Sequence, residues 1–475
     1  MWGRRPVRRE LHARLRGGRG SAPCHGGGWP SNKAMKLRHN SAFVRFWTAS
    51  TVSDFGTYIT TVALSVLVLV TLNGTALDQG FVNAARWAPY LLFGLLAGIW
   101  VDRFRRRTVL IAGDLGRGIV LALLCLLGVL GFLNVPAVMI LIFIFGTLAL
   151  MSDAAYQSFL PQLVPRPLLT RANARLQQSD TVTQTTGSAV AGGLVAVVTA
   201  PLALLLGAVT HFLSGAVLLS LKHPATNKPP VHTDGSLRRK IGEGLRWIYG
   251  HPRLRPLAWS SHAWFIGSAM MGTVLPALVL NDLKLGALGL GLVLSGAGVG
   301  SVVGTLISIR IGEKLGTGRT IVTARLIQPV ALALIALSPL IAVAVADGPL
   351  DVQTYGPPTE WPVALWSAFA VAVGGQFLFW LSMGVEGPLE MGYWQAVTPD
   401  SLIARMSATR RSINRGMIVL GAPLGGAIAT FSTSSVALWV AAGIMLLSAL
   451  VLLFSKFRNA NVEKDQLTDE EALTH

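Results

Sequence analysis

The sequence predicts an all-α membrane protein with twelve transmembrane helices in two pseudo-symmetric six-helix bundles. Three observations predict this fold class: few charged residues, a series of apolar stretches of bilayer length, and an internal repeat. Only 13% of the 475 residues are charged, against about 25% in an ordinary soluble domain, and 52% are hydrophobic. The chain also holds 51 glycines, which suit close helix packing in lipid.

Twelve segments have the length and apolarity of a spanning helix, which needs about 20 mostly apolar residues. They lie at residues 43–71, 80–101, 108–132, 135–158, 174–199, 202–221, 256–280, 287–311, 320–345, 363–386, 407–430 and 434–456. The spans at 174–199 and 407–430 are the least apolar, because they are rich in Thr, Ser and Gly. The sequence therefore predicts one six-helix bundle over 42–221 and a second over 254–457.

The remaining segments are polar. Residues 1–41 are rich in arginine and lack the apolar core of a secretory signal, so we expect a disordered cytoplasmic extension. Residues 222–253 are expected to link the bundles, and 236–250 alternate basic and apolar residues as an amphipathic surface helix does. Residues 458–475 are expected to form a cytoplasmic tail.

The placement of charge supports this span count. The predicted inner loops carry more than fifteen basic residues, whereas Lys284 is the one basic residue in the predicted outer loops. By the positive-inside rule, both termini of this multi-pass chain lie in the cytoplasm, with the chain in the inner (cytoplasmic) membrane. The net charge of +18 is therefore a topology signal. A nucleic-acid partner is disfavoured, because the basic residues are scattered over many loops.

The two halves repeat in sequence. PRPLLTR at 165–171 matches PDSLIAR at 399–405, and GSAVAG at 187–192 matches GAPLGG at 421–426, both 234 residues apart. Parallel six-helix repeats predict alternating access, with a small-molecule site between the halves near the midplane. No G-x-x-x-x-G-K-S/T motif is present, which disfavours an ATP-driven pump.

Two motifs resemble those of the major facilitator superfamily. GIWVDRFRRR at 98–107 is similar to its loop signature G-x-x-x-D-R-x-G-R-R, with Arg105 in place of Gly. The cluster at 187–192 resembles the antiporter signature G-x-x-x-G-P-x-x-G-G, although Ser188 replaces the Pro, whereas the second copy keeps Pro423. The resemblance covers about 42–457. AARWAP at 84–89 and EGLRWI at 243–248 are typical of the branch with enterobactin exporters and macrolide efflux pumps.

The resemblance implies a conformational latch at the cytoplasmic side, where Asp102 would accept hydrogen bonds at the start of the eleventh span. The residues assigned to the latch are Gly98, Asp102, Arg103, Arg106, Arg107 and Arg405. Topology enforcement alone is the alternative role. The glycine clusters are expected to let helices pack and tilt between the halves, and they comprise Gly187, Gly192, Gly193, Gly421, Pro423, Gly425 and Gly426.

Ionisable residues within spans are candidates for proton coupling, because a charge in lipid is costly. Asp54 lies mid-span in the first segment, with Arg86 as its expected partner, and a structural ion pair is the alternative. Asp153 and Glu386 occupy nearly equivalent places in the two halves, and both are expected to face the cavity. Asp114 and Arg117 are expected to form a local helix-face pair, since they are three residues apart.

The substrate-cavity candidates are ring-bearing side chains in the seventh and tenth spans: His262, Trp264, Phe265, Phe377 and Trp380. Packing against lipid or within the bundle is the alternative role. Neither cysteine has a nearby partner and no histidine–cysteine cluster is present, so no metal, disulfide or cofactor is expected.

These features predict a monomeric secondary transporter, not an enzyme, with a small-molecule substrate and membrane lipids around it. The resemblance implies proton-coupled efflux of amphipathic molecules such as drugs, siderophores or secondary metabolites, powered by the proton motive force. A lysophospholipid flippase, proton-coupled uptake and a non-transporting scaffold or sensor are the alternatives.

Overall fold

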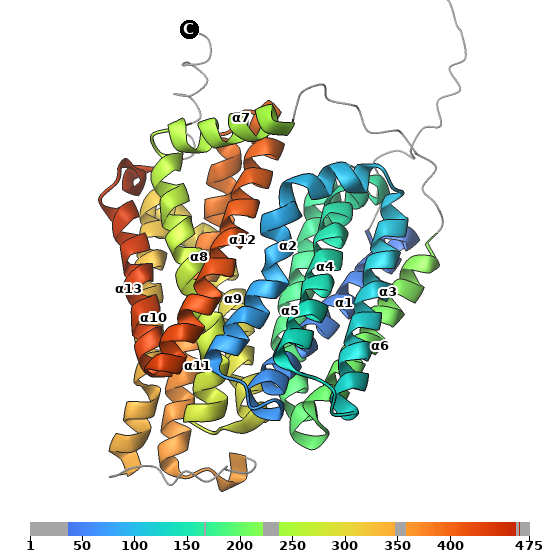
Figure 1. The fold of residues 1–475 in the computed structure, drawn as a ribbon. Helices are drawn as coiled ribbons and strands as arrows, with labels where there is room; N and C mark the ends of the chain where they lie inside the picture. The colour runs from blue at the N-terminus through green and yellow to red at the C-terminus, as the bar shows by residue number, and fades with distance from the viewer. Residues whose placement is uncertain (1–36, 166–167, 222–236, 347–357, 462–464, 466–475) are drawn as a thin grey trace, which may run out of the picture.

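The computed structural model describes residues 37–165, 168–221, 237–346, 358–461 and 465. Within these ranges the chain forms thirteen α-helices and no strand (Figure 1). The first bundle contains α1 (Ser41–Val66), α2 (Ala76–Asp102), α3 (Arg106–Val129), α4 (Val135–Leu163), α5 (Leu169–Val197) and α6 (Ala200–Leu219). The second contains α8 (Leu254–Ala277), α9 (Gly286–Leu315), α10 (Thr317–Ala346), α11 (Val363–Ala396), α12 (Asp400–Phe431) and α13 (Ser434–Leu453). Helix α7 (Leu237–Gly250) precedes the second bundle.

Each expected span corresponds to one long helix, and nine of the described helices are long and apolar enough to cross a membrane. The other three, α2, α5 and α12, have 27, 29 and 32 residues, and the count of twelve crossings stays a prediction. Helices α5 and α12 begin earlier than their spans, and α11 ends ten residues later than the expected 386. The added turns carry polar side chains, which hydropathy does not recognise as helix.

The two bundles share one packing scheme, which confirms the internal repeat. In the first bundle α1 packs on α5 and α6, α3 on α4 and α6, and α2 on α4. The equivalent contacts recur in the second, where α8 packs on α12 and α13, α10 on α11 and α13, and α9 on α11. Helices α1 and α8 even end alike, in five-residue π-helical turns, η2 (Leu67–Thr71) and η4 (Leu278–Asp282).

The bundles meet through two equivalent helix pairs, α2 with α12 and α5 with α9. Close backbone approach requires glycine at both contacts. A Cβ on Gly426 of α12 would lie 2.4 Å from the Ala76 carbonyl oxygen, and one on Gly192 of α5 would lie 2.6 Å from that of Ala287. Because these two glycines are 234 residues apart, the repeat places them at matching points of the interface.

The other expected packing glycines have different neighbours. Gly187 faces Tyr58 of α1, whereas Gly421 and Gly425 face α8, so these three pack within their own bundles. Gly193 has only a leucine side chain at 3.9 Å. Pro423 does lie between the bundles, because a Cβ on Gly80 would come within 2.9 Å of its Cα. The expectation of glycines between the halves is therefore right for Gly192 and Gly426 and wrong for Gly187, Gly421 and Gly425. Gly193 faces Leu288 of α9, a helix of the other bundle.

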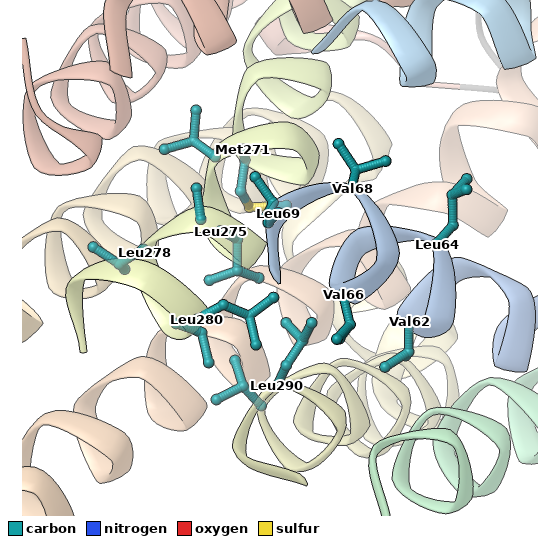
Figure 2. Packing of buried hydrophobic residues seen from close by; sticks show 14 of the residues in the cluster. Val62, Leu64, Val66, Val68, Leu69, Met271, Leu275, Leu278, Leu280 and Leu290 are labelled. Carbon is teal, nitrogen blue, oxygen red and sulfur yellow. The ribbon is translucent and has the colours of Figure 1, made fainter. Parts of the chain in front are cut away.

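An apolar cluster joins the bundles at the face where η2 and η4 contact each other, which we call the far face. Figure 2 shows side chains of α1, η2, α8, η4 and α9 meeting there: Val62, Leu64, Val66, Val68, Leu69, Met271, Leu275, Leu278, Leu280 and Leu290. Burial of these apolar side chains holds the two bundles together at the far face.

Helix α7 marks the opposite face, which we call the α7 face (Figure 1). The helix expected at 236–250 is α7, and it packs on α8 and α12. Trp247 donates its indole N–H to Thr398 Oγ1 at 3.1 Å, and Glu243 forms an ion pair with Arg405 of α12. Most of the predicted extension (1–36), part of the linker (222–236) and most of the tail lie outside the described residues.

Candidate functional site

A cavity of about 790 Å³ lies between the bundles, on the α7 side of the apolar cluster. Its walls come from α2 and α4 of the first bundle and from α8, α10, α11 and α12 of the second. Its volume is within the range of sites for small organic ligands, about 300–1,000 Å³. Gly98, in the last turns of α2, also lines it, and an added Cβ there would meet nothing within 4 Å. The bundles therefore touch at the far face and separate toward the α7 face.

Part of the cavity wall is aromatic. Tyr90, Trp264 and Phe265 line it, and the Trp264 indole donates to Gln328 Oε1 at 2.6 Å. Trp264 and Phe265 therefore lie in the wall of the inter-bundle cavity, and their contact with a substrate stays a prediction.

The other three ring-bearing candidates do not line this cavity. His262 is 7% exposed, and its ring nitrogens contact Tyr249 Oη at 2.7 Å and Asn414 Oδ1 at 3.0 Å. Phe377 lies where α11 crosses α9, since its carbonyl faces Gly300. Trp380 packs edge-on against Phe379. Their placement in the substrate cavity was wrong, because helical spacing alone does not tell which face of α8 or α11 is open.

Arginines dominate the α12 side of the cavity. Arg410 forms an ion pair with Glu390 at 3.1 Å. Arg411 donates to Gln157 Oε1 of α4 at 3.2 Å, across the gap between the bundles. The guanidinium of Arg415 stacks on Trp87, 4.2 Å from the ring centroid. Within the described chain, neither Arg411 nor Arg415 has a carboxylate within ion-pair distance.

A second cavity, of about 560 Å³, lies inside the first bundle among α1, α3, α4, α5 and α6. Four carboxylates line it, those of Asp54, Asp114, Asp153 and Asp180. Asp153 lines both cavities and accepts a hydrogen bond from Tyr90 Oη at 2.6 Å. Asp153 therefore lies between the acidic cavity and the arginine-rich one, and its role in proton coupling stays a prediction.

A buried network adjoins the acidic cavity. Asp114 forms an ion pair with Arg117, as their spacing predicted. It also accepts hydrogen bonds from Ser53 and Ser214. Ser152 lines the same cavity, is 6% exposed, and its hydroxyl has no hydrogen-bond partner in the described structure.

The second bundle holds a buried ion cluster. Arg325, 3% exposed, forms ion pairs with Glu386 and with Glu390, the latter at 2.8 Å. Gln328 donates to Glu386 at 3.0 Å, and Trp394 donates to Glu390 at 3.2 Å. Because each buried charge has an opposite partner, the cluster offsets the high cost of placing ions inside a bundle.

The two networks occupy equivalent positions with reversed charge. Asp114 and Arg325 are 211 residues apart, as are the first residues of η2 and η4. Each contacts a serine of the bundle's last helix. Ser214 donates to Asp114 and to the Ala49 carbonyl at 2.9 Å, and Ser448 contacts Arg325 at 3.1 Å and donates to the Ser260 carbonyl at 2.8 Å. The repeat therefore conserves the framework while exchanging a carboxylate for a guanidinium.

Two of the expected proton-coupling residues are placed differently from the prediction. Arg86 does not pair with Asp54: it donates to Thr61 Oγ1 at 3.1 Å and lies 5.8 Å from the Trp87 ring centroid. Glu386 is 0% exposed and does not face the cavity, because Arg325 and Gln328 enclose it. Glu390, one helical turn further on, lines the cavity instead.

The expected latch stays a prediction, because the structure does not describe its central side chain. Arg405 pairs with Glu243, and the side chain of Asp102 lies outside what the structure describes. Arg106 donates to the Ser158 carbonyl at 3.0 Å, and Arg107 to the Leu218 carbonyl at 3.1 Å. Both guanidiniums therefore approach carbonyl groups near helix C-termini, where the helix dipole favours cations. Arg103 is exposed.

Sequence reasoning did not select Arg325, Glu390 and Arg415 as site residues. Arg325 and Arg415 lie within expected spans, so the cost of an intramembrane charge was a signal that could have selected them. Glu390 lies beyond the expected end of its span, and only the longer α11 brings it into the cavity. Within the described ranges, no group of three or more His, Cys, Asp or Glu residues could hold a metal ion.

The fold and the inter-bundle cavity define a membrane transporter, and comparison with known proteins identifies the family. A family model described as "transmembrane secretion effector" matches residues 34–348. The chain belongs to this family of major facilitator transporters, which are not enzymes.

Relatives and solved structures agree with this assignment. An uncharacterised major-facilitator-type transporter of Sinorhizobium fredii, y4rN, is 25% identical over 86% of this chain and 93% of its own. The staphyloferrin A transporter of Staphylococcus aureus is 24% identical over 57% of this chain and 68% of its own. The nucleoside transporter NupG superposes with a TM-score of 0.69 at 12% identity, covering 87% of this chain and 99% of that one. A bacterial ferroportin homologue in an inward-facing state gives 0.66 at 15%, covering 88% and 99%. The two solved structures support the fold alone.

Proposed function

We propose that the chain is a secondary active exporter, which expels small amphipathic organic molecules in exchange for protons. The observation that carries the proposal is the cavity between two equivalent bundles, closed at the far face and lined by side chains of both. Rocking of the bundles about the glycine contacts would close the α7 face and open the far face. The mixed aromatic and charged lining suits a substrate with an apolar body and a polar group.

The acidic cavity is proposed to carry the protons. Asp54 lies there in mid-span, beside the carboxylates of Asp114, Asp153 and Asp180, and an ionisable group within a span is a candidate to carry a proton. Asp153 reaches both cavities, so its charge state would be sensed in each. Glu386 has no part in this proposal, since its side chain is fully buried and paired with Arg325.

Direction and topology are also proposals. The family description as a secretion effector supports export. The positive-inside pattern supports a cytoplasmic α7 face, with both termini in the cytoplasm and two bundles, 42–221 and 254–457, in the inner membrane. The cavity would then open to the cytoplasm, where an exporter takes up its substrate. Closing it would bring Asp102 toward α12, where the Arg405–Glu243 pair would have to rearrange.

Everted membrane vesicles test the proposal. Vesicles that contain the full chain are energised and offered a panel of fluorescent amphipathic dyes, with and without a protonophore. We expect accumulation of at least one dye that the protonophore abolishes and that Asp54→Asn removes. Glu313→Gln is the control, because Glu313 is exposed at the end of α9.

Two results would contradict the proposal. Dye uptake that is equal with and without the protonophore would contradict proton coupling. A change in lysophospholipid distribution between leaflets, without movement of any dye, would favour the flippase alternative.

A further inference from the structure

The strongest unassigned feature is the pair of arginines, Arg411 and Arg415, one helical turn apart on α12. Both line the inter-bundle cavity. Arg411 reaches a neutral amide oxygen of Gln157, at 3.2 Å, and Arg415 reaches an aromatic face at 4.2 Å. A guanidinium carries five N–H donors, so most of the donors on this pair are available to a ligand.

The other cations of the cavity are already neutralised. Arg325 is held by two glutamates, and Arg410 is held by Glu390. Asp153, the remaining carboxylate of the cavity wall, accepts the Tyr90 hydroxyl at 2.6 Å. Arg411 and Arg415 therefore present positive charge to the cavity that no carboxylate in the described residues pairs with.

From this arrangement we propose that the cavity binds small organic acids, with the substrate carboxylate held by Arg411 and Arg415. The planar fork of a guanidinium matches a carboxylate in a bidentate pair. Trp264 and Phe265, also in the cavity wall, would contact the apolar body of the molecule. The inference rests on the proposed transport function and adds a substrate class to that function.

Binding to the purified full chain, in detergent and without any gradient, tests the proposal. The probes are two xanthene dyes with the same ring skeleton: fluorescein, which carries a carboxylate, and rhodamine 6G, a cationic ester. Fluorescence anisotropy gives the dissociation constant of each. We expect fluorescein to bind at least about tenfold more tightly than rhodamine 6G, because only fluorescein presents anionic oxygens that can accept the charged hydrogen bonds.

Variants assign this preference to the arginine pair. Arg415→Gln and Arg411→Gln are each expected to weaken fluorescein binding about tenfold and to leave rhodamine 6G binding unchanged or stronger. Arg415→Lys should fall between the wild type and Arg415→Gln, since it keeps the charge but loses the fork. Asp153→Asn should strengthen fluorescein binding by removing a nearby like charge. Arg319→Gln, an exposed arginine of α10, removes the same charge outside the cavity and should change nothing.

A second measurement uses smaller compounds, so that the proposal is also tested if xanthene dyes are too large for the cavity. Thermal stabilisation by 2-naphthoate is compared with that by its methyl ester and by 2-naphthylmethylamine. Stabilisation by the acid alone, lost in Arg415→Gln, supports the proposal. Stabilisation by the ester or the amine equal to that by the acid overturns it. The proposal is also overturned if none of the three compounds stabilises the protein and fluorescein binds no more tightly than rhodamine 6G. Acid binding without accumulation in energised vesicles would instead contradict the export proposal and leave this one standing.

Discussion

The two bundles have the same helix packing but different polar interiors. In the first bundle, Asp114 adjoins a cavity of about 560 Å³ that also holds Asp54. In the second, Arg325 stands at the equivalent position and is buried between Glu386 and Glu390. In the first interior Asp114 is paired with Arg117, but Asp54 faces the cavity without an ion-pair partner in the described structure. In the second interior both glutamates are paired with Arg325. The difference indicates a division of roles, with charge changes in the first bundle and a rigid support in the second.

The strongest test of this comparison removes the central cation of the second bundle. Arg325→Met leaves the buried Glu386 without a cation and leaves Glu390 with Arg410 alone, so we expect the free energy of unfolding to fall by about 3–5 kcal/mol. Unfolding by SDS titration in mixed micelles measures it. Arg319→Met, exposed on the same helix, is the control and should stay within about 0.5 kcal/mol of the wild type. A loss no larger than that of the control would show that the cluster does not support the bundle.

The second test acts on the first bundle. Asp54→Asn keeps the shape of the acidic cavity but removes a group that can gain and lose a proton. If Asp54 carries one coupled proton, a membrane potential of 100 mV supplies about 2.3 kcal/mol to transport by the wild type and none to transport by the variant. This loss corresponds to about a 50-fold fall in the substrate gradient that the transporter can maintain. Substrate accumulation in energised vesicles measures this fall. Unchanged accumulation would remove Asp54 from the coupling mechanism.

The third test compares equivalent hydrogen bonds. Ser448→Ala removes contacts to Arg325 and the Ser260 carbonyl, and Ser214→Ala removes those to Asp114 and the Ala49 carbonyl. Each serine hydroxyl bonds a charged group, so we expect each variant to lose about 1–3 kcal/mol of unfolding free energy. The two losses should be similar. The same SDS titration applies.

A buried serine of the second bundle provides the matched control for this third test. Within the described residues, the hydroxyl of Ser338 bonds only the Ile335 carbonyl of its own helix. Ser338→Ala should therefore lose less unfolding free energy than Ser448→Ala or Ser214→Ala. If one of the two test variants behaves like the control, the two networks are not energetically equivalent.

The smallest expected effect belongs to Ser152, which matches Glu386 at the 234-residue spacing of the repeat. Its hydroxyl has no partner, so Ser152→Ala should change the unfolding free energy by no more than about 0.5 kcal/mol. Thermal unfolding of the purified variant beside Ser214→Ala measures the difference. A loss as large as that of Ser214→Ala would mean that the hydroxyl is bonded within the cavity after all.

Particular residues show how far the sequence predicted the site. The sequence selected four residues because charged and aromatic side chains are few within a span: Asp54, Asp153, Trp264 and Phe265. The structure places each of them beside a cavity. Arg86 and Glu386 were misplaced because span position says nothing about which side chain each one meets.

The sequence by itself determined the class of protein, the positions of the long helices and the two-fold repeat, because bilayer length and apolarity are properties of single segments. Only the tertiary structure decided which charges are paired. Arg325 and Glu386 are 61 residues apart and Arg411 and Gln157 are 254 apart, and both contacts depend on how whole helices rotate against one another. The open α7 face was decided at the same level, because it results from packing the two bundles together at the far face.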